Sequence, residues 1–529
     1  MFLIPFISLV VCYSLHRPLS LQSSLIAIAL IIPLIKNLKP QSKIPLASLP
    51  YIALPVILFA SINSQLEYAS DDAIRCLSMF MAAIIIFLQK ESKWLIRSMI
   101  ACGNIHLIMQ IAGIIAEDEK MSISTIFPMA NEIMFFYMMV MFCAVFAYFK
   151  ENNALWKKYA IAIGILTFIA IIVGDIVHTK ELAIGGEHAL GIWLGLICGT
   201  LFTAMLYIWK KFELPKKIML GFSAIIFSII MSVSIIVVNY DFFSLDARSE
   251  ISSRLDNWRA GWNIVKEKPL GVGLGAYGAN VMQRWPALEN SHQTLGSVTY
   301  DSAHNQFLQM LTETGWLGWL FYSALFALPW IVAVSRYLNT GQMHFLFIAG
   351  TLAAICSVMV VAEAISQFAF IQIIHWGWLV YCVKALRFQK QIIIRPYVRN
   401  LILIVLIPML IFLFYDRGKQ LYSVYLTPLE RDGLAPLGRA LEIHPKNSEA
   451  LSFAWSLHLY HKDYEKAFKT LEAIEEIAGY FWPLAQARAT IYYEMGDLEK
   501  ACEAAKFPFE RYLDEWTLDL KEKLNCGNN

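Results

Sequence analysis

Residues 252–278 read SSRLDNWRAGWNIVKEKPLGVGLGAYG, and residues 301–321 read DSAHNQFLQMLTETGWLGWLF. With the segment between them, they form the only long polar stretch that lies between hydrophobic segments of the chain. They also contain its densest group of Arg, His, Asn and Gly. The segments on either side are apolar enough to predict membrane-spanning helices. We therefore expect a membrane bundle that holds this polar stretch at one surface.

The composition predicts the same class of protein. Of the 529 residues, 58% are hydrophobic and only 16% are charged, and the mean hydropathy is +0.54. This excludes an ordinary soluble globular protein. A span takes roughly 17–25 apolar residues, which predicts an all-α polytopic protein of about 12–13 transmembrane helices. We expect spans one to nine in residues 1–239 and spans ten to thirteen in residues 316–415.

The charges in the connecting segments predict the orientation of the bundle. Short segments rich in Lys and Arg stay in the cytoplasm, and here they alternate with acidic ones such as Glu67, Asp71 and Asp72. The basic clusters include Lys36, Lys39 and Lys43; Lys90, Lys93 and Arg97; Lys150, Lys157 and Lys158; and Lys210, Lys211, Lys216 and Lys217. The alternation predicts a bacterial inner-membrane protein with a cytoplasmic N-terminus, a periplasmic loop at 240–315 and a periplasmic domain at 416–529.

The first half of the polar stretch predicts an amphipathic helix lying on the membrane face. Arg254 stands four residues before Trp258, and Arg248 and Arg259 flank it. Basic side chains at such positions often only reach toward the lipid headgroups. Guanidinium groups are equally suited to clamp the oxygens of a diphosphate. Helix position alone favours the first interpretation.

A glycine-rich segment follows this helix. Pro269 ends the helix, and Gly271, Gly273 and Gly275 allow sharp turns and close approach of the backbone to a ligand. The G-x-G-x-x-G pattern at 273–278 does not lie in a βαβ unit, so it does not predict a dinucleotide site.

His304 and Asn305 open the helix of the second half. Histidine is the side chain best suited to proton transfer near neutral pH, and the neighbouring amide has the chemistry to hold a substrate oxygen. Because His304 is expected outside the bilayer, beside the glycines and the arginine helix, we favour a functional role over a structural one.

Further candidates stand at the outer ends of other predicted spans. Asn131 would line a substrate cavity or cap a helix. His188 follows Glu187 at the mouth of a span, and Glu363 and Gln367 stand one turn apart at another. Polar residues at such positions usually face the interior of a bundle or a cavity. We count Asn131, His188, Glu363 and Gln367 as candidate substrate-binding residues.

The C-terminal residues change in composition and show internal similarity. Between 430 and 525, Ala, Tyr and Gly-Asp positions recur at roughly the 34-residue period of tetratricopeptide repeats. Stacked helical hairpins of this kind form concave protein-binding surfaces, although a helical cap without a partner is the simpler alternative. Cys502 and Cys526 both lie here and would form a disulfide in an oxidising compartment. The nine cysteines have no metal-ligand spacing.

PLGVGLGAYG at 269–278, followed by SAHNQFLQMLTETGWLG at 302–318, resembles the signature loop of a known superfamily. It comprises O-antigen ligases, O-antigen polymerases and protein O-oligosaccharyltransferases. The spacing H-N-x-x-L-x-x-x-x-E-x-G-x-x-G is fairly specific in a polytopic protein. The repeat-like C-terminal domain makes the chain most similar to the pilin-type O-oligosaccharyltransferases.

The resemblance implies a metal-independent, inverting glycosyltransferase without a cofactor. Such an enzyme takes a glycan from undecaprenyl diphosphate at the periplasmic face and passes it to a hydroxyl. By resemblance, His304 is the general base and Arg254 binds the diphosphate, with Arg248 and Arg259 as further ligands. The chain departs from the family in two places. Glu187 and His188 stand where members often have Ser-Arg, and the late His-x-x-x-Glu pattern of protein-modifying members is replaced around Glu363 and Gln367.

Three functions stay open. The first is transfer of a lipid-linked glycan to Ser or Thr of a pilin-like protein. The second is ligation or polymerisation of a surface polysaccharide, with the lipopolysaccharide core or another sugar as acceptor. The third is transport of a lipid-linked glycan, which would predict charged residues near the middle of the bilayer. Membrane lipids are expected partners and nucleic acid is not.

Overall fold

The computed structural model describes most of the chain. The described residues are 19–39, 41–62, 69–89, 96–97, 99–101, 103–105, 107–108, 130–181, 190–239, 250–281, 284, 302–361, 369–386, 388, 390–429, 434–478, 482–511, 515–524 and 526.

The protein is an all-α polytopic membrane protein, as expected. Within the described residues, five helices are long and apolar enough to cross a membrane: Ala154–Val173, Gly191–Lys211, Gln306–Thr340, Met343–Val360 and Pro396–Gln420. Shorter apolar helices cover Ile26–Asn37, Leu46–Ala60 and Met134–Phe149. The total of about 12–13 spans stays a prediction.

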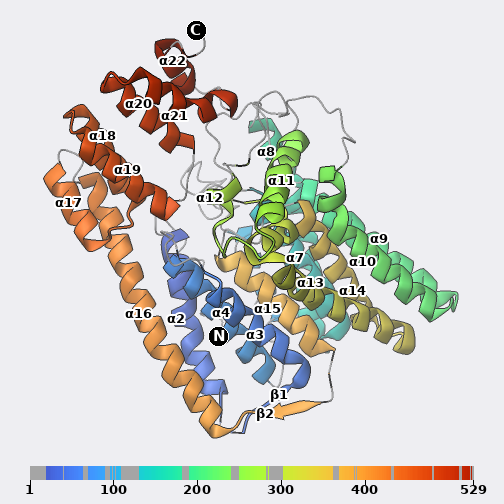
Figure 1. Cartoon of the computed structure of the whole chain (residues 1–529). Coiled ribbons are helices and arrows are strands. Elements are labelled where there is room, and N and C mark those ends of the chain that lie inside the picture. The colour runs from blue at the N-terminus through green and yellow to red at the C-terminus, as the bar shows by residue number, and fades with distance from the viewer. Residues whose placement is uncertain are drawn as a thin grey trace.

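The helices before the polar stretch are distributed across the bundle, with α13, α14 and α15 packed among them (Figure 1). They are α2 (Leu19–Asn37), α3 (Leu49–Ala60), α4 (Ala69–Leu88), α7 (Ala130–Lys150), α8 (Ala154–Glu181), α9 (Leu190–Lys211) and α10 (Lys216–Asn239). A 3₁₀ turn, η1 (Leu46–Ser48), leads into α3. The polar stretch contains α11 (Glu250–Glu267), α12 (Tyr277–Val281) and the start of α13 (Gln306–Thr340). They are followed by α14 (Met343–Val361), α15 (Ala369–Ala385) and α16 (Pro396–Leu429).

Small residues let α9 and α14 pack closely. A Cβ atom added at Gly199 would lie 2.7 Å from the Cβ of Ala354, and one added at Gly350 would overlap Thr203. Apolar side chains gain little from leaving lipid, so close backbone approach is the usual basis of such contacts in membranes. This pair therefore forms a rigid part of the scaffold behind α13.

Basic side chains cap helix ends. The ammonium of Lys384 donates to the carbonyl of Ile86 at 2.7 Å, and that of Lys210 donates to the carbonyl of Leu338 at 2.8 Å. The last carbonyls of a helix lack partners within it, so a nearby ammonium group satisfies them and favours the helix dipole. Lys210 belongs to one of the basic clusters from which the cytoplasmic side is predicted.

A two-stranded ribbon departs from the all-α pattern. Strand β1 (Lys43–Pro45) pairs antiparallel with β2 (Gln391–Ile393), with Ile44 opposite Ile392. The ribbon joins the segment before α3 to the segment before α16. Strands of three residues have no detectable alternation in the sequence, so this pairing could not be predicted.

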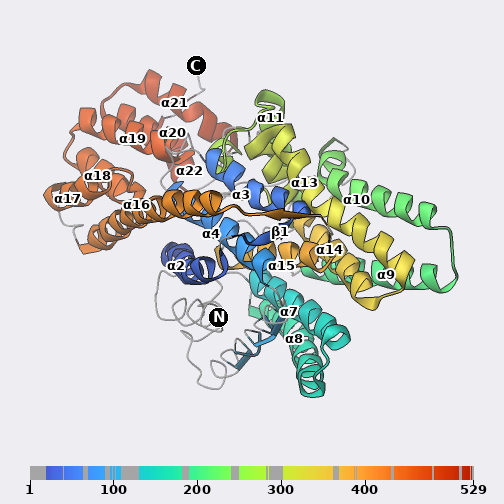
Figure 2. The same cartoon turned by 90° about the horizontal axis from the view of Figure 1, so that it is seen from below.

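Two helices run through the boundaries predicted for the loop and the C-terminal domain. Helix α13 begins at Gln306 and contains a kink at Gly315, where φ is 69° and ψ is −174°. Helix α16 is continuous over 34 residues, Pro396–Leu429. It passes along the edge of the bundle near α4 and reaches the C-terminal helices (Figures 1 and 2).

The C-terminal helices form hairpins. They are α17 (Leu434–Ile443), α18 (Ser448–Tyr460), α19 (Tyr464–Ala478), α20 (Trp482–Glu494), α21 (Leu498–Arg511) and α22 (Glu515–Leu524). Asp463 precedes α19, and Asp497, 34 residues later (497 − 463), precedes α21. Each aspartate accepts a hydrogen bond from the backbone N–H of the lysine three residues on and pairs with that lysine's ammonium. The same turn therefore occurs twice at the expected period.

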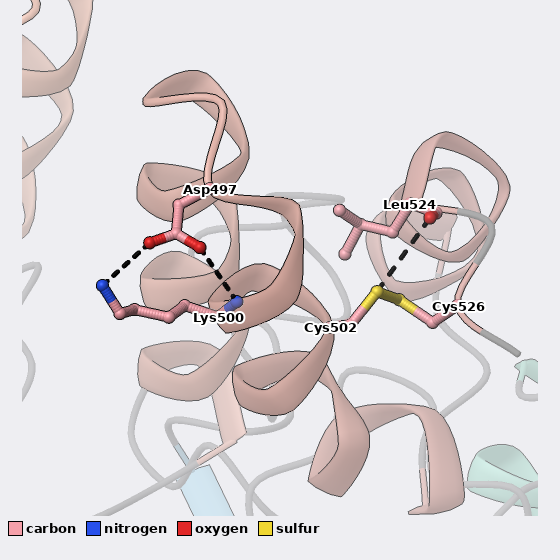
Figure 3. Close-up of a disulfide and its surroundings, with 5 residues drawn as sticks. All are labelled: Asp497, Lys500, Cys502, Leu524 and Cys526. Carbon is pink, nitrogen blue, oxygen red and sulfur yellow. Dashed lines mark hydrogen bonds and ion pairs between the residues drawn. A yellow bond between two sulfur atoms is a disulfide. The ribbon is translucent and has the colours of Figure 1, made fainter.

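A disulfide joins Cys502 and Cys526, whose Cα atoms are 5.7 Å apart. It connects α21 to the segment after α22, close to the Asp497–Lys500 turn that starts α21 (Figure 3). The pairing that the sequence left open is therefore present. Disulfides persist in oxidising compartments such as the periplasm.

Candidate active site

Helix α11 holds the segment just before His304. The side-chain amide of Asn257 donates to the carbonyl of Ser302 at 2.8 Å, and the indole N–H of Trp258 donates to the carbonyl of Ala303 at 2.7 Å. Asn257 is fully buried and Trp258 nearly so. A buried hydrogen bond costs more to break than it contributes when made, so α11 and this segment move as one unit.

His304 occupies a constrained position. Its φ of 47° lies in the left-handed region, which a residue with a side chain adopts only when its surroundings enforce it. Its backbone N–H donates to the hydroxyl of Ser302 at 3.2 Å. The ring is half-buried, which leaves it reachable from outside. The turn therefore holds the backbone of His304 in one conformation and leaves the residue partly exposed.

Asn305 links this turn to α13. Its side-chain oxygen accepts a hydrogen bond from the N–H of Leu308 at 2.9 Å, and so caps the helix. The residue is 1% exposed, and its Nδ2 atom has no hydrogen-bond partner among the described residues. A buried donor of this kind lacks part of the usual compensation for burial. It is suited to an oxygen atom of a substrate.

Tyr277, the first residue of α12, closes a second contact with α11. Its hydroxyl donates to Asn257 Oδ1 at 2.7 Å. A Cβ atom at Gly261 would lie 3.0 Å from that hydroxyl oxygen. Asn257 therefore accepts from Tyr277 and donates to Ser302, which fixes the orientation of its amide.

The glycine-rich segment lies against the kink of α13. The N–H of Val272 donates to the carbonyl of Thr312, and the N–H of Gly273 donates to that of Glu313, both at 3.0 Å. A Cβ atom at Gly271 would stand 2.4 Å from the Glu313 carbonyl oxygen. At Gly315 it would stand 2.5 Å from the carbonyl carbon of Leu270. The close approach that Gly271 and Gly315 permit is therefore between two stretches of backbone.

A buried carboxylate joins these parts. Glu313 is 4% exposed and accepts hydrogen bonds from the backbone N–H groups of Gly275 and Tyr277. Gln309 donates to Glu313 Oε1 at 3.2 Å and accepts from the N–H of Ala303 at 3.4 Å. A closed circuit of hydrogen bonds thus runs from the His304 turn through α13 and the glycine segment to α11 and back.

The region that contains this circuit is similar in sequence to a known protein family. Residues 182–323 match the family model described as O-antigen ligase. This match supports the O-antigen ligase superfamily for that region of the chain. None of the curated proteins compared with it matches.

The matched family implies an enzyme that transfers glycans, in general terms. It also implies a lipid-linked glycan and an acceptor such as lipopolysaccharide as partners. The apolar helices agree with a multi-pass membrane protein. The matched residues include all of α11 and α12 and the first half of α13, so the hydrogen-bonded circuit lies within the ligase-type region.

The two described arginines of α11 differ in their surroundings. Arg259 forms an ion pair with Asp256 at 3.5 Å, and Asp256 is fully buried. Arg254 is half-buried and stands one helical turn before Trp258, so both lie on the side of α11 that meets the His304 segment. Helix α11 therefore carries both Arg254 and the side chains that hold the segment before His304.

The other predicted site residues are not placed by the structure. Arg248, His188, Glu363 and Gln367 lie outside the described residues. Asn131 falls in α7, but its side chain is not described. Among the described residues, no group of three or more His, Cys, Asp or Glu is placed to hold a metal ion.

Four residues of the circuit were missed as site residues by the sequence analysis. These are Asn257, Tyr277, Gln309 and Glu313. Glu313 had a detectable signal, since it is an acidic residue in an otherwise apolar helical pattern, nine positions after His304. Gln309 stands one turn before it. Asn257 and Tyr277 had no detectable signal in the sequence, because their roles depend on contacts between segments distant in sequence.

Proposed function

We propose that the protein transfers a glycan from undecaprenyl diphosphate to a hydroxyl of a protein acceptor at the periplasmic face. The single observation that supports this most strongly is the fixed His304 turn, held by the helix that carries Arg254. This supports a base and a cation that act at one surface of the ligase-type region. These are the two groups that displacement of a diphosphate by a hydroxyl requires.

In the proposed reaction, His304 takes the proton of the acceptor hydroxyl as its oxygen attacks the anomeric carbon of the glycan. The bond from that carbon to the diphosphate oxygen breaks, and undecaprenyl diphosphate leaves with the electron pair. Attack opposite the leaving group inverts the anomeric centre. Arg254 binds the diphosphate and stabilises the negative charge that develops on it.

The orphan amide of Asn305 has a role in this scheme. It lies next to His304 and is buried, and its Nδ2 donor has no hydrogen-bond partner among the described residues. We assign to it a hydrogen bond to an oxygen of the acceptor or of the sugar being transferred. An interaction of this kind orients the substrate, and orientation contributes a large part of many enzymatic rate enhancements.

The C-terminal domain supports a protein as the acceptor. Its repeated turns at Asp463 and Asp497 agree with a tetratricopeptide-like array, a type of domain that binds proteins. The Cys502–Cys526 disulfide agrees with a periplasmic position. A pilin-like protein with an accessible Ser or Thr is the partner that we propose.

A second function has its own support. The matching family is described as O-antigen ligase, and this favours a sugar hydroxyl of the lipopolysaccharide core as acceptor. His304 and Arg254 would have the same roles, because a sugar hydroxyl and a Ser or Thr hydroxyl are both alcohols. Only the surface that presents the acceptor would differ.

Glycosylation in a bacterial host distinguishes these acceptors. The host would supply a lipid-linked oligosaccharide and a pilin-like protein, and both pilin and lipopolysaccharide would be blotted. We expect glycosylated pilin with the wild type and with His344→Ala, a matched control on α14, but not with His304→Ala. Modified lipopolysaccharide beside bare pilin would favour the ligase. If His304→Ala changed neither product, transport of the lipid-linked glycan would become the better account.

A further inference from the structure

Helix α16 carries a buried polar stripe that the proposed chemistry does not use. Arg417, Gln420 and Ser423 recur every three residues and are 4%, 2% and 0% exposed. Their neighbours Phe412 and Tyr422 are 67% and 54% exposed. Buried polar groups are retained where they are paired. The stripe therefore marks the face of α16 that contacts the rest of the protein.

The first part of the stripe contacts α4. Arg417 forms an ion pair with Asp71 at 3.7 Å and donates a short hydrogen bond to Gln420. Asp71 is 2% exposed and also pairs with Arg75 at 2.6 Å. Removing one member of a buried ion pair leaves an uncompensated charge. Helix α16 is therefore fixed against α4 at this point.

The last part of the stripe contacts the C-terminal domain. The hydroxyl of Ser423 donates to the carbonyl of Ala440 at 2.6 Å and accepts from the amide of Asn447 at 2.8 Å. Asn447 also caps α18 through Ala450 at 3.0 Å. The first hairpin of the domain is thus bound to the same continuous helix, about two turns beyond Arg417.

Helix α3, which packs against α4, in turn adjoins the His304 circuit. The carbonyl of Ser61, at the end of α3, accepts from the N–H of Leu274 in the glycine segment at 2.9 Å. Asp72, next to Asp71, lies close enough to Glu313 for its charge to act on it. The α4 end of the stripe is therefore next to the candidate active site, and the other end is in the C-terminal domain.

We infer that the Arg417–Asp71 pair is a positioning contact that sets the orientation of the C-terminal domain relative to the His304 site. This rests on the proposed function in one respect, namely that the domain receives a protein acceptor. The pair touches no reacting atom. Its loss therefore impairs presentation of a folded protein acceptor, and spares release of the glycan to water, which does not need the domain.

Two measurements on the full-length protein in lipid nanodiscs test this. The first is the distance between spin labels at positions 266 on α11 and 469 on α19, both on exposed lysines. The second compares KM for a pilin-like protein with the rate of glycan hydrolysis from its lipid carrier. The variants are Arg417→Gln, Asp71→Asn and the double variant. Lys419→Gln is the control, because Lys419 is exposed on the same helix.

We expect a narrow distance distribution in the wild type and in Lys419→Gln, and a broad one in Arg417→Gln. KM for the protein should rise about tenfold or more, with hydrolysis changed less than about twofold. The double variant should be no worse than Asp71→Asn alone, since Asp71→Asn already removes the ion pair with Arg417. Ser423→Ala keeps the ion pair but removes the hydrogen bonds to Ala440 and Asn447. We expect it to broaden the distance distribution less than Arg417→Gln does.

An unchanged distribution and an unchanged KM in Arg417→Gln would overturn the inference. Equal loss of hydrolysis and protein transfer would also overturn it, because the pair would then support the active site itself. If the wild type glycosylated no protein, the proposed acceptor would be wrong. The distance measurement would still decide whether the pair orients the domain.

Discussion

The indole N–H of Trp258 donates to the backbone carbonyl of Ala303 at 2.7 Å. This bond connects the helix that carries Arg254 to the residue directly before His304. In the proposed reaction His304 and Arg254 act on opposite sides of the anomeric carbon, His304 on the incoming hydroxyl and Arg254 on the leaving diphosphate. Their relative position must therefore be kept within a fraction of an ångström, since a small misplacement of reacting groups costs up to about 100-fold in rate.

Trp258→Phe tests this contact. Phenylalanine keeps most of the packing but lacks the N–H. The segment before His304 should therefore lose its fixed position on α11. We expect kcat to fall about 10–100-fold, with little change in KM for the lipid-linked donor. Trp262→Phe, on the same helix but packed edge-to-face on Trp316, is the control. Equal activity of Trp258→Phe and wild type would show that the hydrogen bond does not position the site.

Glu313→Gln tests the centre of the circuit. The amide replaces one carboxyl oxygen by an NH₂ group, which accepts no hydrogen bond and opposes the N–H donors that surround it. We expect the unfolding free energy to fall by about 1–3 kcal/mol and activity to fall with it. Glu267→Gln is the matched control, because Glu267 is 55% exposed and pairs with Arg284 at the surface. Thermal unfolding in detergent, measured beside the transfer rate, would show whether both effects occur.

Gly271→Ala tests the packing of the glycine segment on the α13 kink. With φ at 93° and the Glu313 carbonyl oxygen 2.4 Å from the new Cβ, the segment must shift. We expect a loss of about 1–3 kcal/mol in stability and a marked loss of activity. Gly418→Ala, where nothing lies within 4 Å, should be neutral or slightly stabilising. Similar behaviour of both variants in thermal unfolding would count against the described packing.

Much of the fold follows from the sequence, because lipid requires internally satisfied backbone and therefore long apolar helices. The candidate base, the arginine helix and the paired cysteines could also be identified, since each has a chemical signature. The ribbon at Ile44 and Ile392 could not be predicted. The circuit through Asn257 and Tyr277 was also missed, because it joins residues whose proximity is set by packing.

Stability of the C-terminal domain should depend on pH through His444. Burial lowers its pKa, and Asp416 only partly opposes this. The folded state thus prefers the neutral ring, while the unfolded chain takes up a proton below its ordinary pKa of about 6.5. Stability is therefore highest above about pH 6.5 and falls as acidification forces a proton onto the buried ring.

The prediction is a lower unfolding temperature for the domain at about pH 5.5 than at about pH 7.5, and a smaller difference in His444→Gln. His461→Gln, at an exposed position, is the control and should behave like the wild type. The measurement is domain unfolding within the full-length protein, followed by a fluorophore attached to α19. The same pH dependence in His444→Gln and wild type would assign the effect to other groups.

The central claim is that His304 removes the proton of the acceptor hydroxyl. The most direct test is the single-turnover rate of glycan transfer by purified His304→Ala, with donor binding measured separately. General base catalysis contributes about 10²–10⁴-fold, so the rate should fall by at least about 100-fold while donor affinity stays near that of the wild type. A rate within a few-fold of the wild type, at equal protein and bound donor, would contradict the account.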